Sequence, residues 1–252
     1  MPTVLTTRGL LLDMDGTLVD SDAVVERLWR AWGEAHGVPA ERVLAVVHGR
    51  QGYATMAELL PERPMEQNHA DNARMLAEET RDVDGVVAIP GAHRFLTALE
   101  TGALPYALVT SADLALATAR MTAAGLRLPD IRITAESVGA SKPDPEGFLK
   151  GAAALGLEPA DCVAFEDSAA GITAALAAGM RVVGVGPRAA ALGPTVAVPT
   201  LEHVTVAPAA DGAGLTLTLR PEASGEPGRD QSRDRDRADD TAGDRTQPTM
   251  AS

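Results

Sequence analysis

The segment Leu10-Leu11-Leu12-Asp13-Met14-Asp15-Gly16-Thr17-Leu18 places three leucines directly before two aspartates that stand one residue apart. The leucines predict an apolar strand, and the residues behind them predict that the chain turns where this strand ends. Along a regular strand, Asp13 and Asp15 would point to opposite faces. Gly16 permits the turn, so both carboxylates can face one pocket at the carboxyl end of the strand, where open α/β sheets place their ligands.

Two carboxylates in one pocket repel each other unless a cation lies between them. Mg²⁺ takes oxygen ligands of this kind, and it is commonly bound together with phosphate groups. Asp13 and Asp15 therefore predict a site for Mg²⁺ and a phosphate. The alternative explanation of this pair, taken alone, is an acidic turn that follows a strand.

The composition limits the class of protein and its partners. The chain has 252 residues, of which 45% are hydrophobic, and this suffices for one large α/β domain or for one domain with an insert. A formal net charge of -13 argues against nucleic acid or an anionic membrane as a partner. A phosphorylated small molecule is also an anion, so its site needs a local positive field from Mg²⁺, lysine and backbone N–H groups. We expect the chain to act on such a substrate as a monomer.

The cysteine content and the apolar runs bear on the compartment. Cys162 is the single cysteine of the chain, which excludes an internal disulfide and fits a reducing cytoplasm. We expect this residue to be the first residue of a buried strand. The N-terminus shows no signal-peptide pattern, and no apolar run approaches the length of a membrane-spanning helix. The sequence therefore predicts a cytoplasmic protein.

The apolar pattern changes from helical to alternating along the chain. Residues 21–86 show apolar positions at helical spacing, with Trp29 and Trp32 as the expected core of a helical cap. From residue 87 on, short apolar strands alternate with helices, which predicts a parallel sheet covered by helices on both faces. The expected fold class is therefore α/β, with a Rossmann-like doubly wound sheet and an inserted helical cap domain.

The expected domain boundaries follow from this change of pattern. Residues 1–20 and 87–205 are expected to form the core, and residues 21–86 the cap. Residues 206–220 remain unassigned. The last segment, 221–252, contains a charged, repetitive run without aliphatic residues, which cannot bury enough surface to offset the entropy of ordering the chain. We expect this segment to be a disordered polar tail.

Three further polar motifs stand near the carboxyl ends of predicted strands or in the loops that follow them. Thr110 and Ser111 can bind phosphoryl oxygens through hydroxyl and N–H groups at a helix start. Two prolines stiffen the loop that presents Lys142. Glu166 and Asp167 form a second acidic pair that would complete a magnesium site. Each motif alone is explained as well by helix capping or by solvated charge, but their common place at successive strand ends favours one site.

The four motifs together resemble those of the haloacid dehalogenase superfamily of Mg²⁺-dependent phosphotransferases. The matching positions are, in motif order, Asp13-Met14-Asp15-Gly16-Thr17-Leu18, Thr110, Lys142 and Glu166-Asp167. The resemblance covers about residues 10–185. Dehalogenase members lack the second aspartate of the first motif, so Asp15 favours phosphate chemistry over carbon–halogen chemistry.

Within this superfamily, three segments are similar to sugar-phosphate phosphatases, a group that includes 2-deoxyglucose-6-phosphate and glycerol-3-phosphate phosphatases. The segments are His48-Gly49-Arg50-Gln51 in the cap, the lysine segment 141–151 and the acidic segment 165–172. The resemblance implies that the cap selects the substrate, and the candidate residues are His48, Arg50 and Gln51. The alternative is a polar cluster in solvent at the end of a helix.

The resemblance also implies a mechanism. Asp13 attacks phosphorus and forms an aspartyl-phosphate, while Asp15 protonates the departing oxygen and then deprotonates the hydrolytic water. Thr110 and Lys142 hold the phosphoryl oxygens, where charge accumulates. The implied Mg²⁺ ligands are Asp13, the backbone carbonyl of Asp15, Asp167 and, directly or through water, Glu166.

Two other functions fit the same motifs. A phosphomutase similar to β-phosphoglucomutase would return the phosphate to the sugar instead of transferring it to water. A non-catalytic ligand-binding protein would keep the fold without turnover. The leading hypothesis is a Mg²⁺-dependent phosphatase of a small sugar or polyol phosphate, because residues 48–51 favour that group and every chemical residue is present.

Overall fold

The centre of the fold is a parallel β-sheet. The computed structural model describes residues 1–210, 212 and 214–220, and in this part of the chain six strands pair in the order β6-β5-β2-β7-β8-β9. Every neighbouring pair in this sheet is parallel. The strand bounds are Gly9–Leu12 (β2), Tyr106–Val109 (β5), Arg132–Ile133 (β6), Cys162–Glu166 (β7), Arg181–Val185 (β8) and Val196–Val198 (β9). The expected α/β sheet is confirmed, whereas the tail expected at 221–252 lies outside the described residues.

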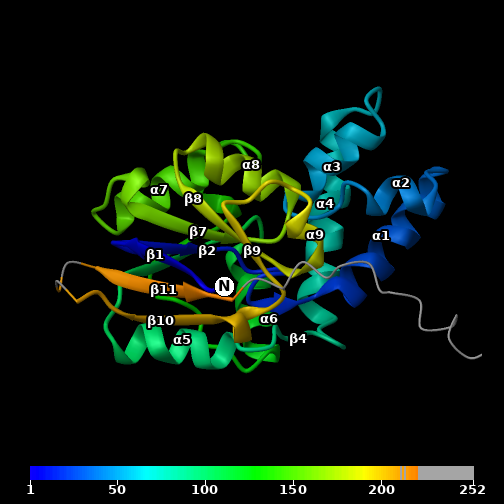
Figure 1. Ribbon diagram of the computed structural model, residues 1–252. Helices are drawn as coiled ribbons and strands as arrows, with labels where there is room; N and C mark the ends of the chain where they lie inside the picture. Colours follow the sequence, from blue (N-terminus) through cyan, green and yellow to red (C-terminus); the bar gives the residue numbers. More distant parts are fainter. Residues whose placement is uncertain (211, 213, 221–252) are drawn as a thin grey trace, which may run out of the picture. The chain divides into compact units, whose positions relative to one another are not determined.

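Helices cover both faces of this sheet (Figure 1). Leu10 and Leu12 pack into an apolar layer with α5 and α6, while Leu11 packs into a second layer with α7 and α8. Alternation along one strand therefore divides the core into two layers, as a doubly wound sheet requires. The helix bounds are Ala92–Thr101 (α5), Leu114–Ala123 (α6), Glu146–Ala154 (α7), Ala169–Ala177 (α8) and Gly186–Ala190 (α9).

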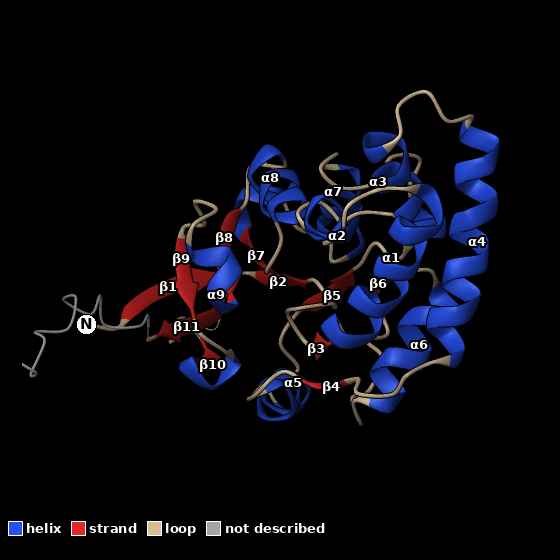
Figure 2. Ribbon diagram, turned by 90° about the vertical axis from the view of Figure 1, so that its right-hand side faces the viewer, coloured by secondary structure: helices blue, strands red, loops and turns tan. Residues whose placement is uncertain are grey.

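A helical segment follows the first strand of the sheet and lies at the upper right of Figure 1. It is called the cap below, and its helices are α1 (Asp22–His36), α2 (Ala40–Leu44), α3 (Gly52–Leu59) and α4 (Met65–Arg81). Trp29 and Trp32 lie in its apolar core, as expected, with ring centroids 5.5 Å apart. Figure 2 shows α4 beside α6, and these two helices are in contact. The cap therefore rests on the core through α4.

Two short strands carry the chain into the cap and out of it. They are β3 (Val19–Asp20) and β4 (Val87–Ala88), and they pair antiparallel, with Val19 opposite Ala88. The two crossings between core and cap therefore lie side by side.

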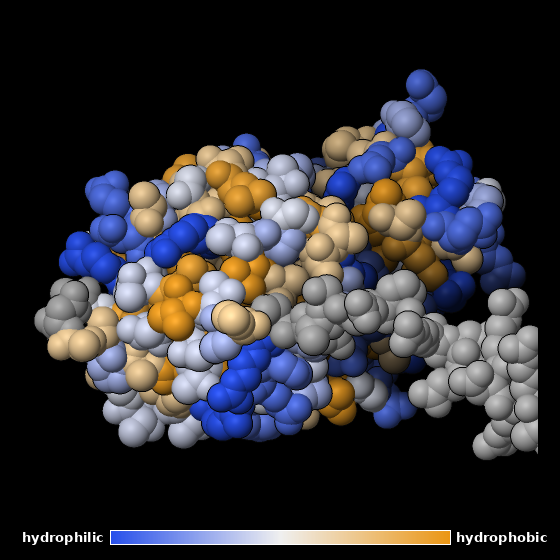
Figure 3. Space-filling view, viewed as in Figure 1, coloured by the Kyte–Doolittle hydropathy of each residue, from blue (hydrophilic) through white to orange (hydrophobic). Residues whose placement is uncertain are grey.

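A second, antiparallel sheet was not predicted from the sequence. It consists of β1 (Thr3–Thr7), β11 (Leu215–Leu219) and β10 (Val204–Pro208), with β11 in the middle. The leucines of β11 are buried in the same apolar layer as α5, and the threonines between them are half-buried. Part of the unassigned segment 206–220 thus contributes to the core. On the face drawn in Figure 3, hydrophilic residues surround smaller apolar patches. None of the helices in the described part of the chain has the length and hydrophobicity that a membrane crossing requires.

Candidate active site

The turn after β2 brings Asp13 and Asp15 to the same pocket. The amide of Asp13 still donates to the carbonyl of Phe165 in the neighbouring strand, at 3.0 Å, and the chain turns directly afterwards. Gly16 has a φ of 81°, and a Cβ atom there would lie 2.1 Å from Oδ2 of Asp167. Glycine is therefore required for the backbone conformation and for the close approach of a second acidic loop.

Lys142 lies at the centre of the site. Its Nζ atom donates to Oδ1 of Asp13 and to Oε1 of Glu166, each at 2.6 Å, and to the carbonyl of Val109 at 3.0 Å. All three side chains are buried. Burial opposes the charge of Lys142, but Asp13 and Glu166 outweigh it and raise the pKa of the lysine. The ammonium group is thus held in place and stays charged beside Asp13.

Glu166 is bound through both carboxylate oxygens, with Oε1 on Lys142 and Oε2 on its own loop. Its Oε2 accepts from the amide of Asp167 at 2.9 Å, and from the amide and the hydroxyl of Ser168 at 3.1 and 3.0 Å. A Cβ atom on Gly171, in the first turn of α8, would lie 1.7 Å from Oε1 of Glu166. The start of α8 is therefore shaped to accommodate this carboxylate. The hydrogen bonds of Glu166 to Lys142 and to its own loop fix the backbone position of the next residue, Asp167.

An acidic cluster stands beside the lysine. Asp13, Glu166 and Asp167 each offer an oxygen, and these oxygens lie within 4.8 Å of one another. Oδ2 of Asp167 accepts from Arg188 at 2.7 Å, whereas its buried Oδ1 has no hydrogen-bond partner among the described residues. Burial and the charge of Glu166 raise the pKa of Asp13 well above its usual range and that of Asp167 to about 7. An oxygen-only donor set with an unsatisfied buried oxygen fits a hard divalent cation.

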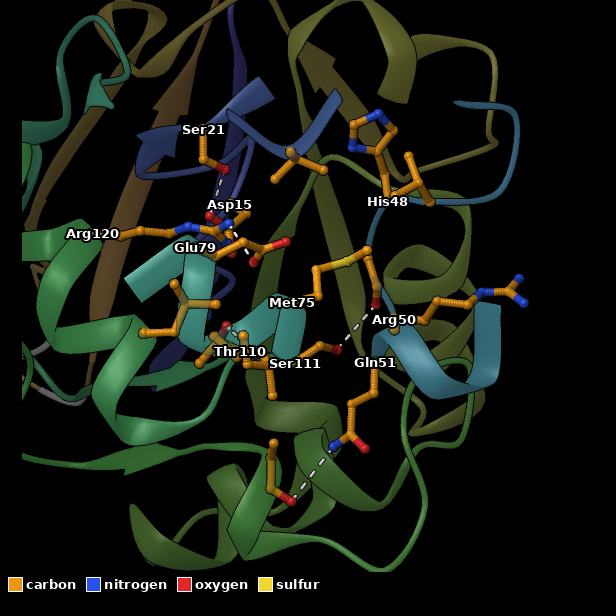
Figure 4. A pocket seen from close by; sticks show the side chains of 18 of the residues that line it. Asp15, Ser21, His48, Arg50, Gln51, Met75, Glu79, Thr110, Ser111 and Arg120 are labelled. Carbon is orange, nitrogen blue, oxygen red and sulfur yellow. Dashed lines mark hydrogen bonds and ion pairs between the residues drawn. The ribbon is translucent and has the colours of Figure 1, made fainter. Parts of the chain in front are cut away.

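Asp15 belongs to a chain of charged groups that links core and cap. Its Oδ1 accepts from the hydroxyl of Ser21 at 2.7 Å, and its Oδ2 lies 2.8 Å from Nη1 of Arg120. The other Nη atom of Arg120 donates to Oε2 of Glu79, in the cap helix α4, at 2.9 Å. Figure 4 shows Arg120 reaching between Asp15 and Glu79. Both carboxylate oxygens of Asp15 are therefore bound, one by Ser21 and the other by Arg120.

Thr110 and Ser111 line the same pocket, but they do not start a helix. The amide of Thr110 donates to the carbonyl of Ile133 in the sheet, and its hydroxyl accepts from the amide of Ala112 at 3.1 Å. Helix α6 begins only at Leu114, after the N-cap residue Asp113. Thr110 and Ser111 therefore lie in the loop before this helix, and Asp113, a strong capping residue, starts it. The hydroxyl of Ser111 donates to the carbonyl of Gly49 in the cap at 3.1 Å.

The cap residues His48, Arg50 and Gln51 line the pocket as well. Nε2 of Gln51 lies 3.5 Å from the carbonyl of Ala135 in the core. The guanidinium group of Arg50 pairs with Glu58 and points away from Asp15 (Figure 4). Burial, followed by the charge of Arg188, lowers the pKa of His48. Their role in substrate selection stays a prediction.

Several residues of the site were not predicted from the sequence. Arg120 is one of them, although it lies on the buried face of α6 together with Leu116 and Met121. A charged residue at the helical spacing of an apolar face was a signal that could have been used. Arg188 had no such signal, because it lies in a short helix that the sequence did not indicate.

The chain belongs to the haloacid dehalogenase-like hydrolases, because a model of that family matches residues 7–179. Hexitol phosphatase A of Escherichia coli (strain K12) is 40% identical over 178 residues, which cover 71% of this chain and 82% of that protein. Glycerol-1-phosphate phosphohydrolase 2 of Saccharomyces cerevisiae is 31% identical over 195 residues, which cover 73% and 76%. The suspected family is thus confirmed, and relatives in it are named as phosphatases.

Solved structures show the same fold. A hydrolase from Pseudomonas syringae matches with a TM-score of 0.65 and 23% identity, over 77% of this chain and 93% of that chain. A β-phosphoglucomutase from Clostridium difficile matches with a TM-score of 0.63 and 20% identity, over 77% and 92%. At these identities the likeness bears on the fold alone.

Proposed function

We propose that the protein is a Mg²⁺-dependent phosphatase that hydrolyses a small sugar or polyol phosphate through an aspartyl-phosphate intermediate. The observation that carries this proposal is the group formed by Asp13, Lys142 and Oδ1 of Asp167, an oxygen that has no hydrogen-bond partner in the described part of the chain. A carboxylate nucleophile, a fixed ammonium group and a free oxygen ligand beside it are what phosphoryl transfer needs. The named activities of the relatives at 31–40% identity support hydrolysis of polyol phosphates.

The side chains of the core take the following roles. A carboxylate oxygen of Asp13 attacks phosphorus while Asp15 gives a proton to the departing oxygen. Asp15 then takes a proton from the water that cleaves the aspartyl-phosphate. Lys142, Thr110 and Ser111 hold phosphoryl oxygens, with Thr110 and Ser111 adjacent in the loop between β5 and α6.

The metal would be held by the acidic cluster described above. The proposed ligands are Asp13, the backbone carbonyl of Asp15 and Asp167, with Glu166 binding directly or through water. Since Glu166 is already hydrogen-bonded through both oxygens, contact through water is favoured. When bound, Mg²⁺ offsets negative charge on the phosphoryl group and on the attacking carboxylate.

The cap is proposed to select the leaving group. Its residues share the pocket with Asp13 and Asp15, and the contact between Ser111 and Gly49 brings the cap loop onto the phosphate-binding side. A cap in this place keeps bulk water away from the reacting group. His48, Arg50 and Gln51 are the proposed contacts to the sugar or polyol.

The test is a screen for release of inorganic phosphate from sugar and polyol phosphates in the presence of Mg²⁺. We expect release from at least one of them, and Asp13→Asn should abolish it. Asp130→Asn is the matched control, because Asp130 lies on the surface and pairs with Arg127. A β-phosphoglucomutase-like enzyme would instead isomerise a sugar phosphate without releasing phosphate. Isomerisation without release by the wild-type protein would overturn the proposal.

A further inference from the structure

Among the residues that the structure describes, Arg120 is the most deeply buried charged group that the proposed mechanism does not use. It is 3% exposed, and its partner Glu79 is 6% exposed. Each Nη atom takes a different carboxylate, with Asp15 on the core side and Glu79 on the cap side. Arg120 therefore joins the proposed acid/base to the helix of the cap that rests on the core.

Stability alone does not account for this arrangement. Moving an arginine and a glutamate out of water carries a large desolvation penalty, and a protein with apolar residues of similar volume in their place is often equally stable. Burial raises the pKa of Glu79 to about 7 even with the arginine beside it, which reflects that cost. The other buried residues on this face of α6 are apolar, and an apolar residue in place of Arg120 would fill the space without the desolvation penalty of a charge. A role in the reaction explains why charge is kept there.

The geometry suits the positioning of Asp15. A guanidinium group is planar and rigid, so fixing one Nη atom on Glu79 also fixes the direction of the other. Oδ2 of Asp15 forms an ion pair with that second Nη atom, and Oδ1 of Asp15 accepts from the hydroxyl of Ser21. The carboxylate of Asp15 is thereby held at two points, while each oxygen keeps a further lone pair for a proton.

We infer that Arg120 is a positioning residue for Asp15, and that Glu79 holds Arg120 in place from the cap. Protonation of the leaving group then depends on the contact between α4 and α6. In this step the bond from Asp13 to phosphorus forms, the bond from phosphorus to the leaving oxygen breaks, and the proton of Asp15 moves to that oxygen. The inference rests on the proposed function and adds to it the pair that orients its acid.

Two substrates that differ in their need for an acid provide the test. The kcat/KM value reports steps up to the release of the leaving group. An alkoxide needs a proton to leave, whereas p-nitrophenolate leaves without one. We compare p-nitrophenyl phosphate with the alkyl phosphate that the wild-type protein hydrolyses fastest. Arg120→Lys should lower kcat/KM for the alkyl phosphate by about 10²-fold or more, the usual contribution of a positioned acid, and for p-nitrophenyl phosphate by a far smaller factor.

Glu79→Gln keeps the shape of the side chain. It should also lower kcat/KM more for the alkyl phosphate than for p-nitrophenyl phosphate, but by smaller factors than Arg120→Lys. It also keeps the test decisive if Arg120→Lys fails to fold, which circular dichroism would reveal. Arg127→Lys is the matched control, because Arg127 is exposed and pairs only with Glu100 and Asp130 among the described residues. Equal losses on both substrates, or no loss, would overturn the inference. A wild-type protein that hydrolyses neither substrate would instead overturn the proposed function.

Discussion

The two carboxylate oxygens of Asp167 are used unequally. Its Oδ2 is held by Arg188, and its Oδ1 is buried without a partner among the described residues. A buried oxygen in this state costs free energy unless a donor or a cation fills the place. The unequal use of the two oxygens therefore points to a cation on Oδ1.

The titration of Asp167 gives a prediction for Mg²⁺ binding. Burial and the charge of Glu166 raise the pKa of Asp167 to about 7 in the metal-free protein. Below that pH the carboxyl group carries a proton that the metal must displace, and above it the carboxylate is already ionised. We expect the apparent Kd for Mg²⁺ to rise as the pH falls below about 7, by about tenfold per pH unit from Asp167 alone, and the raised pKa of Asp13 adds to this rise. Isothermal titration calorimetry at several pH values measures this.

A variant separates this effect from general changes with pH. Asp167→Asn should bind Mg²⁺ weakly at every pH, because the amide cannot be ionised. An affinity of the wild-type protein that stays constant from acidic to neutral pH would contradict the assignment of Asp167 as a ligand.

Individual residues also show what the sequence could predict of the site. Asp13, Asp15, Lys142 and the pair Glu166-Asp167 were all expected at strand ends, and the structure places them around one pocket or beside it. The acids could be found because they follow apolar strands directly, and Lys142 because two prolines stiffen its loop. The contact between Arg120 and Glu79 spans 41 positions and depends on how two helices are rotated, so no local pattern specifies it.

Strand β11 illustrates the same limit for whole elements. Its sequence Leu215-Thr216-Leu217-Thr218-Leu219 alternates strictly and is a strand signal, but its neighbours cannot be read from it. It pairs with β1 near the N-terminus, where Thr3 lies opposite Leu219. Such a pairing between distant parts of the chain leaves no trace in local spacing. The parallel sheet was predictable because its strands and helices alternate along the chain.

The burial pattern of β11 predicts how much the second sheet contributes to stability. Leu217 is fully buried against the layer of α5, whereas Thr218 is half-buried on the other face. Leu217→Ala should lower the free energy of unfolding by about 2–5 kcal/mol. Thr218→Ala, the matched control in the same strand, should lower it by less than about 1 kcal/mol. Urea unfolding followed by circular dichroism measures both, and similar values for the two variants would contradict the placement of β11 in the core.

Core and cap meet around the proposed reaction centre through several contacts. The hydroxyl of Ser111 donates to Gly49, and Arg120 pairs with Glu79. Arg188 donates to Asp22, at the start of the cap, as well as to Asp167. We propose that the core carries out phosphoryl transfer and that the cap selects the leaving group. The pocket is lined by residues of both parts.

Phosphoryl transfer in this protein is proposed to phosphorylate Asp13 beside a cation held by acids that are distant in sequence. The most direct test is intact-mass spectrometry of the protein after brief reaction with a substrate and Mg²⁺ and quenching in acid, followed by peptide mapping. We predict one added phosphoryl group on Asp13 in the wild-type protein, and none in Asp13→Asn or when Mg²⁺ is removed by a chelator. A phosphoryl group on another residue, or one that persists in Asp13→Asn, would contradict the assignment of Asp13 as the nucleophile.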